Sequence, residues 1–266
     1  MKMRILTRFA DSFTSFKEGL QLEKIEGIVI KTQEYKEKDK LLWIFTRTYG
    51  KVSLVAHSAK KSSSHLSACT QRFTYGLYVF TWRNGLSTLR SGEILNNFNM
   101  IKTNLWKTAY ASYLLELIDK GIHDGEQHPY VYEWLLRILQ KIDEDEDAEI
   151  LIRIFEMKMT EVFGIQPNIE SCVHCNSCEN LVGFTVADGG FLCGNCFVLS
   201  QDAILYPPAV LHLLYLFSKI GPKQIGNISV KQETKNMLKK ILYDYLDRHT
   251  GIFFNSRKFI EESDLL

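Results

Sequence analysis

Hydrophobic and polar positions divide this 266-residue chain into two parts near Asn96. Before Asn96, β-branched and aromatic residues form short runs bounded by turn residues such as Tyr49-Gly50, Ser62–Ser64 and Asn84-Gly85. These runs predict five strands: Ile25–Lys31, Leu41–Thr48, Lys51–Ser58, Phe73–Trp82 and Leu86–Leu95. Five strands with a long connection between the third and the fourth favour an OB-fold, in which a small sheet closes into a barrel and loses its exposed edges. An SH3-like barrel is the alternative.

After Asn96 the apolar period lengthens from 2 toward 3.6 residues, which indicates helices. The pattern predicts them at Leu105–Gly121, Pro129–Ile142, Ala148–Gly164, Pro207–Ile220 and Lys231–His249. The acidic run Asp143–Glu149 is expected to be a solvated loop and helix start, because acidic side chains are favourable at a helix N-terminus. The fold class is therefore α+β: an N-terminal extension (1–23), an OB-fold barrel (24–100) and a helical domain (101–266).

A four-cysteine hairpin is expected within the helical part. Two Cys-x2-Cys knuckles, Cys172/Cys175 and Cys193/Cys196, are separated by seventeen residues, a spacing typical of four-thiolate zinc sites. Between them, strands around Phe184–Val186 and Phe191-Leu192 flank a turn at Asp188–Gly190. Such a closed site leaves no coordination position for water, so we expect one structural Zn²⁺ and no metal catalysis.

The ligand set is open from the spacing alone. Cys175 and Cys178 form another knuckle and His174 is a spare donor, although using Cys178 would leave Cys172 idle. A reduced cluster without metal and a set of disulfides are the alternatives to a zinc site. Disulfides are the weaker of the two, because nothing else in the chain is typical of a secreted protein.

Targeting signals are absent from the sequence pattern. No run of eighteen apolar residues exists, so we expect no membrane span. The first 24 residues have charges within every apolar run and no small-residue cleavage site, which argues against a signal peptide. This segment is either an amphipathic helix or a poorly ordered extension. We expect a cytoplasmic protein.

The net charge of +1 conceals a division between the two halves. Residues 1–107 hold 18 Lys and Arg against 8 Asp and Glu, and residues 108–266 hold the remaining 14 against 23. A basic half of this size is typical of a protein that binds polyanions. We predict DNA contacts from the basic residues of the barrel, namely Lys31, Lys38, Arg47, Lys51, Lys60, Lys61, Arg72, Arg83 and Arg90.

Aromatic residues are interleaved with these cations. OB-folds hold single strands by following the backbone with Lys and Arg and by stacking bases on rings; the candidates here are Tyr35, Trp43, Tyr49, Phe73, Tyr75, Tyr78 and Trp82. Alternation places Trp43 and Phe45 on one face of their strand and Ile44 and Thr46 on the other, without deciding which face meets solvent.

Catalytic motifs are not found. There is no phosphate-binding glycine loop, no Gly-x-Ser-x-Gly elbow and no His-Glu-x-x-His helix, and the histidines other than His174 are scattered singly. We therefore predict no catalytic residues and no enzyme.

Three segments, taken in order, resemble the RecO family of bacterial recombination mediators. They are EGIVIKTQEYKEKDKLLWIFTRTYGKVSLVAHSAKK at Glu26–Lys61 with Gln71–Phe73, Gly85-Leu86, Leu89 and Glu93; CVHC at Cys172–Cys175 with GFLCGNC at Gly190–Cys196; and GIFFNSRKF at Gly251–Phe259. The first 22 residues have no counterpart in the family, and Cys178 stands where the family needs no ligand. The resemblance therefore favours Cys172, Cys175, Cys193 and Cys196 as the zinc ligands.

The resemblance implies a non-enzymatic mediator, cytoplasmic and associated with the nucleoid. It implies an OB-fold that binds single- and double-stranded DNA and anneals complementary strands. Its expected partners are RecR, the single-stranded DNA-binding protein, whose acidic tail would enter a basic pocket in the helical part, and indirectly RecA. The alternatives are a zinc-stabilised protein adaptor that does not anneal DNA and, third, a nucleic-acid-modifying enzyme.

Overall fold

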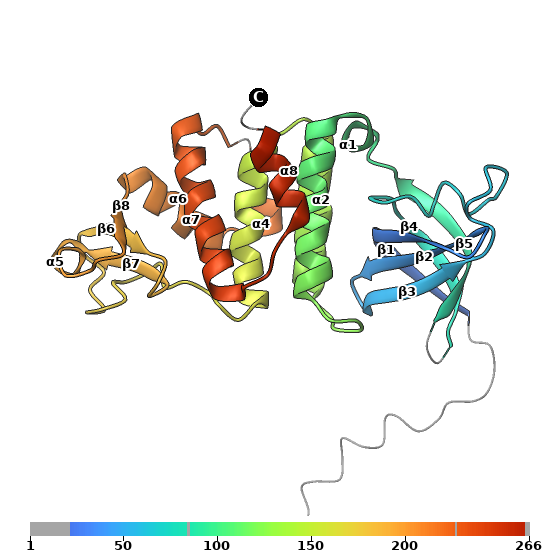
Figure 1. Cartoon of the computed structure of the whole chain (residues 1–266), viewed down its shortest axis with the longest axis horizontal. Coiled ribbons are helices and arrows are strands. Elements are labelled where there is room, and N and C mark those ends of the chain that lie inside the picture. The colour runs from blue at the N-terminus through green and yellow to red at the C-terminus, as the bar shows by residue number, and fades with distance from the viewer. Residues whose placement is uncertain (1–21, 84–85, 227, 264–266) are drawn as a thin grey trace, which may run out of the picture.

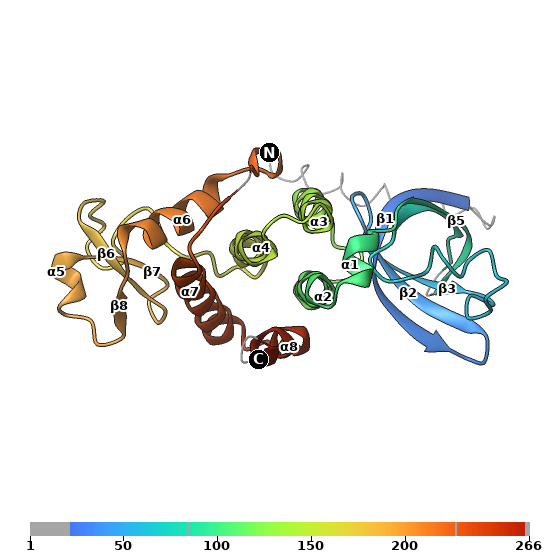
Figure 2. The same cartoon turned by 90° about the horizontal axis from the view of Figure 1, so that it is seen from above.

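The computed structural model describes residues 22–83, 86–226 and 228–263 of the chain. The molecule is elongated: the barrel forms one end, helices form the middle, and a small sheet forms the other end (Figure 1). The view from above shows the same order, with α2, α3 and α4 between the barrel and the small sheet (Figure 2). Residues 1–21 of the expected extension (1–23) and the expected turn Asn84-Gly85 lie outside the described residues, and residues 22 and 23 belong to β1.

Five strands close into the barrel, in the order β1-β2-β3-β5-β4: β1 (Leu22–Tyr35), β2 (Asp39–Thr46), β3 (Gly50–Ala56), β4 (Tyr75–Thr81) and β5 (Ser87–Asn96). All pairs are antiparallel except β3 and β5, which pair in parallel through Leu54 with Ser87 and Val55 with Thr88. Each of the five predicted strands is confirmed. The closed barrel with its long third connection confirms the OB-fold class.

The barrel interior is a core of its own. It contains Ile25, Leu42, Ile44, Leu54 and Phe80, and it is extended by Ala59, Leu66 and Cys69 from the connection between β3 and β4. Because β3 ends at Ala56 and that connection follows, these three side chains fill the barrel end at which β3 stops. At the opposite end of the barrel, where β3 begins, the β3–β4 connection contributes no side chains to the core.

The outer face of β1 and β2 packs on the helices. Phe45 is fully buried in the helical core and its ring centroid lies 5.9 Å from that of Tyr132, while Trp43 is partly buried against the same core. Ile44 points into the barrel. The Trp43–Phe45 face therefore faces protein, which a single sequence could not decide.

Helices follow the barrel: α1 (Asn99–Thr103), α2 (Leu105–Gly121), α3 (Pro129–Asp143), α4 (Ala148–Val162), α6 (Pro208–Lys219), α7 (Gln232–Thr250) and α8 (Asn255–Ser263), with a 3-10 turn η1 (Pro222–Gln224). The five predicted helices are confirmed. Asn104 caps α2 by accepting from the Lys107 backbone N–H, and Asp147 caps α4 in the same way through Ile150. The acidic run is thus a helix start, as expected. Helices α1 and α8 were missed because each is too short to show a period.

The cysteine lobe, residues 168–206, is inserted between α4 and α6. Its sheet has the order β7-β6-β8, formed by β6 (Leu181–Thr185), β7 (Gly190–Cys193) and β8 (Ala203–Leu205), and a single turn of helix, α5 (Gly194–Phe197), follows β7. The predicted hairpin is confirmed. The third strand, β8, and α5 were not predicted. Within the part of the chain that the structure describes, no helix has the length and apolar character needed to cross a membrane.

Candidate nucleic-acid interface and cysteine cluster

Four cysteine sulfurs converge at the tip of the cysteine lobe. The Sγ atoms of Cys172, Cys175, Cys193 and Cys196 all lie within 4.8 Å of one another, and Cys175 Sγ and Cys193 Sγ are 3.6 Å apart. Four sulfurs bound to Zn²⁺ at about 2.3 Å in a tetrahedron would be about 3.8 Å apart. The cluster therefore has the size that a four-thiolate metal site requires.

Close backbone packing holds the two knuckles together. The Phe191 N–H donates to the Asn168 carbonyl (2.9 Å), and the Val173 N–H donates to the Phe191 carbonyl (2.9 Å). A side chain at Gly190 would place its Cβ 2.2 Å from the Asn168 oxygen and 2.5 Å from Val173 Cγ1. Glycine is needed there because any larger residue would separate the first knuckle from β7.

The spare donors lie outside the cluster. Cys178 is exposed and does not belong to the group of four sulfurs. His174 Nε2 lies 3.1 Å from Asp188 Oδ2, so its ring is engaged by the turn of the hairpin. Neither residue completes the tetrahedron.

Thiol proximity changes the proton affinities within the cluster. Burial raises the pKa of Cys172, but backbone N–H groups of Cys193, Cys175 and His174 outweigh burial and lower that pKa to about 6. The thiol of Cys175 and burial raise the pKa of Cys196 to about 12. Because the four sulfurs are so close, the negative charge of one thiolate disfavours deprotonation of the others. A bound divalent cation would offset this repulsion and stabilise the thiolates.

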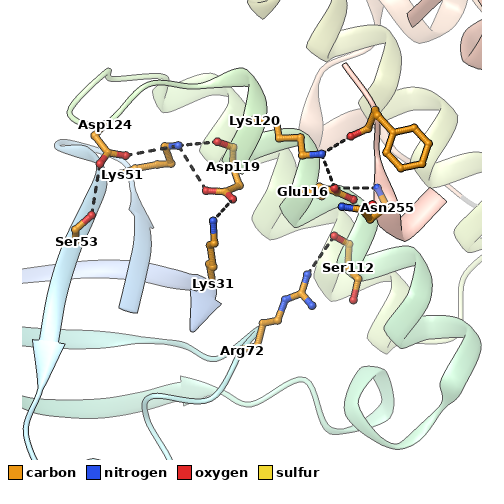
Figure 3. A network of polar contacts seen from close by, with 11 residues as sticks. Lys31, Lys51, Ser53, Arg72, Ser112, Glu116, Asp119, Lys120, Asp124 and Asn255 are labelled. Carbon is orange, nitrogen blue, oxygen red and sulfur yellow. Dashed lines mark hydrogen bonds and ion pairs between the residues drawn. The ribbon is translucent and has the colours of Figure 1, made fainter. Parts of the chain in front are cut away.

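Three of the basic residues predicted to contact DNA join the barrel to α2 (Figure 3). Lys31 Nζ lies 2.8 Å from Asp119 Oδ2. Lys51 is 7% exposed, donates to the Asp119 carbonyl at 2.7 Å and lies within 3.7 Å of the carboxylates of Asp119 and Asp124. Arg72 donates to the Ser112 carbonyl at 3.3 Å. Lys51 is buried by these contacts and Arg72 is partly buried, whereas Lys31 remains exposed beside Asp119.

The closing segment of the chain, Gly251–Phe259, is fixed to the same helix. Glu116 of α2 accepts hydrogen bonds from the backbone N–H groups of Asn255 (3.0 Å) and Ser256 (2.8 Å), at the start of α8. A carboxylate at a helix N-terminus satisfies donors that have no partner within the helix. The segment that the sequence singled out is thus the docking segment of α8.

The other predicted basic residues lie on the barrel surface. The Lys60 N–H donates to the Lys38 carbonyl (3.1 Å), which brings the β1–β2 loop beside the head of the β3–β4 connection. Lys38 and Lys61 are exposed there, and Lys60 pairs with Glu34 at 2.7 Å. The remaining members of the predicted set are exposed elsewhere on the barrel: Arg83, Arg90, which donates to Thr81 Oγ1, and Arg47, which pairs with Glu133.

Two of the candidate rings are distinctly exposed. Tyr49 and Trp82 are each 36% exposed, and their ring centroids are 5.9 Å apart. Phe73 and Tyr78 are buried, so they belong to the core. The structure therefore reduces the list of clearly accessible rings to a single pair at the barrel end where β3 begins.

A pocket of about 250 Å³ opens in the helical domain, and three of its four charged lining residues are basic. It lies between α2, α4, α7 and α8 and is lined by Tyr110, Glu149, Arg153, Gln232, Lys235, Asn236, Lys239, Tyr243 and Ile260. Arg153 is 3% exposed; it lies 2.9 Å from Glu156 Oε2 and donates to Tyr243 Oη at 3.2 Å. The guanidinium is thus fixed in the wall of the pocket by a carboxylate and a tyrosine of the protein itself.

Comparison with known proteins agrees with these features along the whole barrel and helical domain. The family model "Recombination protein O N terminal" matches residues 20–98, and "Recombination protein O C terminal" matches residues 102–258. A DNA repair protein RecO of Listeria monocytogenes serotype 4a is 42% identical over 243 residues, covering 91% of this chain and 95% of the relative. Those of Bacillus pumilus (38%; 91% and 95%) and Halalkalibacterium halodurans (40%; 90% and 94%) are similar.

The chain belongs to the RecO family. It is accordingly a member of a family of DNA repair and recombination proteins. The two RecO models meet between residues 98 and 102, where β5 has ended and α1 begins. The first model begins at residue 20, so most of the extension lies outside the RecO match.

The resemblance implied a basic pocket in the helical part of this RecO-family chain, but the sequence did not identify its residues. Its charged residues come from positions as far apart as Glu149 and Lys239, and no linear spacing joins them. An Arg at position 153 within an apolar helix, Ala148–Val162, is the one signal that the sequence offered. A buried cation is rare unless it is paired or functional, and Arg153 is paired with Glu156.

Proposed function

We propose that this protein is a non-catalytic DNA-binding recombination mediator. In this proposal it binds single- and double-stranded DNA, anneals complementary strands and, with RecR, helps to load RecA onto strands coated by the single-stranded DNA-binding protein. It would do so in the cytoplasm, at the nucleoid. Family membership supports the proposal, and the exposed cations of the barrel are the observation that carries DNA binding.

The proposed DNA surface differs from the one that the sequence predicted. Lys31, Lys51 and Arg72 contact α2, and Arg47 pairs with Glu133 of α3, so we leave these four out. The retained set is the loop cluster Lys38, Lys60 and Lys61 with the more distant Arg83 and Arg90. Lys and Arg that neutralise phosphates account for most of the affinity of a protein that does not read sequence.

Base stacking is proposed for Tyr49 and Trp82. Each stacked base contributes about 1–3 kcal/mol in proteins that bind single strands, so two rings suffice to distinguish single strands from duplex. The covered face of β2 and β3, where Trp43, Phe45 and Lys51 contact helices, is not available for this purpose. The barrel end and loops are therefore the proposed path.

Reversing two charges of the loop cluster should weaken DNA binding. We expect Lys38→Glu with Lys61→Glu to lower affinity for single strands by about tenfold or more, with a similar reduction for every sequence, because phosphate contacts carry no sequence information. The log–log salt slope should fall in magnitude by about 1.4, at about 0.7 for each phosphate that is no longer neutralised. Fluorescence anisotropy of a labelled oligonucleotide across a salt series measures both.

The matched control reverses two exposed lysines near α7, Lys223→Glu with Lys231→Glu, which changes net charge equally. Binding should be close to wild type in that control. Equal reductions in the two variants would mean that net charge alone attracts DNA, and a salt-independent affinity would contradict the proposal.

The helical pocket is the proposed site for the acidic tail of the single-stranded DNA-binding protein. Three basic residues, Arg153, Lys235 and Lys239, line it against one acidic residue, Glu149. Lys235 pairs with Asp147 (2.5 Å) and Glu149 (3.4 Å), and Arg153 pairs with Glu156 (2.9 Å), so we assign the contacts with a ligand to the three basic residues together. Their excess over the one acidic lining residue supports binding of an acidic peptide in an otherwise acidic half of the chain.

Binding of an acidic peptide with a free C-terminal carboxylate should depend on Lys239. We expect Lys239→Glu to reduce affinity by about tenfold, a change of about 1.4 kcal/mol typical of a charge-assisted contact. Lys240→Glu is the matched control, since Lys240 follows directly on α7, pairs with Asp244 and does not line the pocket. Isothermal titration calorimetry with both variants decides the point; an equal response would exclude this pocket.

Zn²⁺ is the proposed occupant of the cysteine cluster, held by Cys172, Cys175, Cys193 and Cys196. A closed set of four sulfurs leaves no open position, so the metal would stabilise the lobe and take part in no reaction. The soft thiolate donors favour zinc over magnesium or calcium.

Strand annealing distinguishes this proposal from a protein adaptor. Complementary oligonucleotides coated with the single-stranded DNA-binding protein should anneal faster when this protein is added. The same assay with and without RecR tests the proposed partnership. An adaptor that lacks DNA activity would leave the annealing rate unchanged, and conversion of a labelled oligonucleotide to a new product would show an enzyme.

A further inference from the structure

An acidic residue, Asp39, lies within the loop cluster of lysines. It is the first residue of β2, and its side chain is 14% exposed. Asp39 Oδ1 accepts the backbone N–H of Ser58 at 2.8 Å, and Asp39 Oδ2 lies 2.9 Å from His57 Nδ1. A carboxylate within a surface proposed to bind phosphates needs a reason, because its negative charge opposes the ligand.

Ser58 opens the β3–β4 connection with an unusual backbone conformation. Its φ is +58°, in the left-handed region that residues other than glycine adopt rarely. Because β3 ends at Ala56, the turn at Ser58 sets the direction in which the connection leaves the barrel. Asp39 takes the N–H of Ser58, and the Ser58 carbonyl accepts from the Lys61 N–H at 3.1 Å. One lysine of the cluster is therefore attached to the turn that Asp39 supports.

The same carboxylate joins the two loops that carry the cluster. Asp39 stands at the end of the β1–β2 loop, whereas Ser58 belongs to the β3–β4 connection. Beside this contact, the Lys60 N–H donates to the Lys38 carbonyl at 3.1 Å. These two hydrogen bonds bring the cations of both loops together.

A further link between the loop and β1 is more exposed. Lys60 Nζ lies 2.7 Å from Glu34 Oε2, but the Glu34 side chain is 78% exposed, and exposed ion pairs contribute little. Asp39 instead accepts from a backbone N–H with an ionised carboxylate, which is the stronger kind of hydrogen bond. The Ser58 N–H, and after it the His57 ring, hold the pKa of Asp39 below its ordinary value.

We propose that Asp39 is a positioning residue for DNA binding, which connects the β1–β2 loop to the β3–β4 connection and thereby arranges Lys38, Lys60 and Lys61 in the absence of DNA. This inference rests on the proposed function, in which the loop cluster binds phosphates. Binding costs less when the groups that contact the ligand are already in place. That gain outweighs the repulsion between one carboxylate and the phosphates.

Removing Asp39 should weaken DNA binding although it removes a negative charge. We expect Asp39→Ala to lower affinity for a labelled single strand by about fivefold, because the two loops separate and the arrangement of the lysines is lost. Asp39→Asn keeps an oxygen for the Ser58 N–H, and its amide can donate to the His57 ring. It should therefore bind at least as tightly as wild type. Fluorescence anisotropy measures both variants.

Glu37→Ala is the matched control. Glu37 lies in the same β1–β2 loop, is exposed, and carries the same charge as Asp39. Its removal should tighten binding by about twofold, because only repulsion is lost. If Asp39→Ala tightens binding as Glu37→Ala does, Asp39 acts through its charge alone and the positioning role is wrong.

Hydrogen–deuterium exchange tests the connection between the loops without DNA. Peptides that cover residues 57–62 should exchange faster in Asp39→Ala, whereas Asp39→Asn and Glu37→Ala should match wild type. Equal exchange in all four proteins would overturn the proposal even if DNA binds. Absence of DNA binding by wild type would reject the proposed function and the positioning role with it, and the exchange result would still decide whether Asp39 joins the loops.

Asp39→Glu carries the test if Asp39→Ala does not fold. This variant keeps the charge but displaces the carboxylate from the Ser58 N–H by one methylene group. We expect affinity for single strands to fall by about threefold, because the arrangement of the loops is disturbed at constant charge. Charge alone predicts no change, so unchanged affinity together with unchanged exchange would contradict the positioning role.

Discussion

Replacing Cys172 with serine should abolish stoichiometric zinc binding and unfold the cysteine lobe. Cys172 is fully buried, and its Sγ lies within 4.8 Å of the three other sulfurs. Structural zinc contributes about 10–16 kcal/mol to the folding of small zinc peptides, and the lobe has a very small core apart from the metal. That core consists of Cys172, Leu192 and Cys193 with partly buried neighbours.

Metal content by elemental analysis and hydrogen exchange of residues 168–206 measure the two effects. Zinc should fall from about one equivalent to nearly none, because three thiolates bind far more weakly than four. Exchange in the lobe should rise, while DNA affinity should change little, since the barrel lies at the other end of the molecule (Figure 1). The control is Cys178→Ser, which changes an exposed cysteine that does not belong to the cluster of four sulfurs.

Full zinc content in Cys172→Ser with depletion in Cys178→Ser would show that the wrong knuckle was chosen. Wild-type protein should be purified without a chelator for this measurement. If it then contains no metal, or a metal other than zinc, the assignment of zinc to the cluster is wrong. Chelation of the wild-type protein should reproduce the effect of Cys172→Ser on exchange.

Removing the carboxylate of Glu156 should cause the largest loss of stability in the helical domain. We expect Glu156→Ala to lower the free energy of unfolding by about 3–5 kcal/mol, because it leaves a buried cation without its partner. Glu156 is fully buried, lies 2.9 Å from Arg153 Nη1 and accepts from Tyr113 Oη at 2.7 Å. Burial raises the pKa of Glu156, and the guanidinium of Arg153 opposes that rise.

Urea unfolding followed by circular dichroism measures the change. Glu161→Ala on the same helix is the control; Glu161 is exposed, and its removal should change stability by less than about 0.5 kcal/mol. If Glu156→Ala does not fold, Glu156→Gln keeps the shape of the side chain and the acceptor for Tyr113 and should still destabilise measurably. A change below about 1 kcal/mol in both variants would contradict the assigned role of the pair.

The Arg153–Glu156 pair also connects stability to the proposed pocket. Arg153 lines that pocket, and the guanidiniums of Arg153 and Arg257 each lie 4.4 Å from the centroid of the Tyr243 ring. Arg257 is held in turn by Asp247 at 2.6 Å. A variant of Glu156 should therefore lower stability and alter the charge and position of Arg153 in the pocket, whereas Lys239→Glu should weaken binding of an acidic peptide without lowering stability.

Local pattern was sufficient for the five barrel strands, the five long helices and the cysteine hairpin. Strand periods, breakers and caps are properties of neighbouring residues, so the five barrel strands and the five long helices were readable without any tertiary contact. The spacing of the cysteines located the cluster, and the resemblance to the RecO family favoured Cys172, Cys175, Cys193 and Cys196 over Cys178. Short elements such as α8 give no period, and their existence depends on partners such as Glu116.

Only the tertiary structure decided which side chains remain accessible. The sequence by itself determined an α+β chain with an OB-fold, a basic first half and a four-cysteine hairpin. It could not show that Lys31, Lys51 and Arg72 contact α2, nor that Phe45 faces α3, because burial of a barrel face depends on what packs against it. Docking of the helical domain on β1 and β2 made that choice, and it left the loop cations and the Tyr49–Trp82 pair exposed.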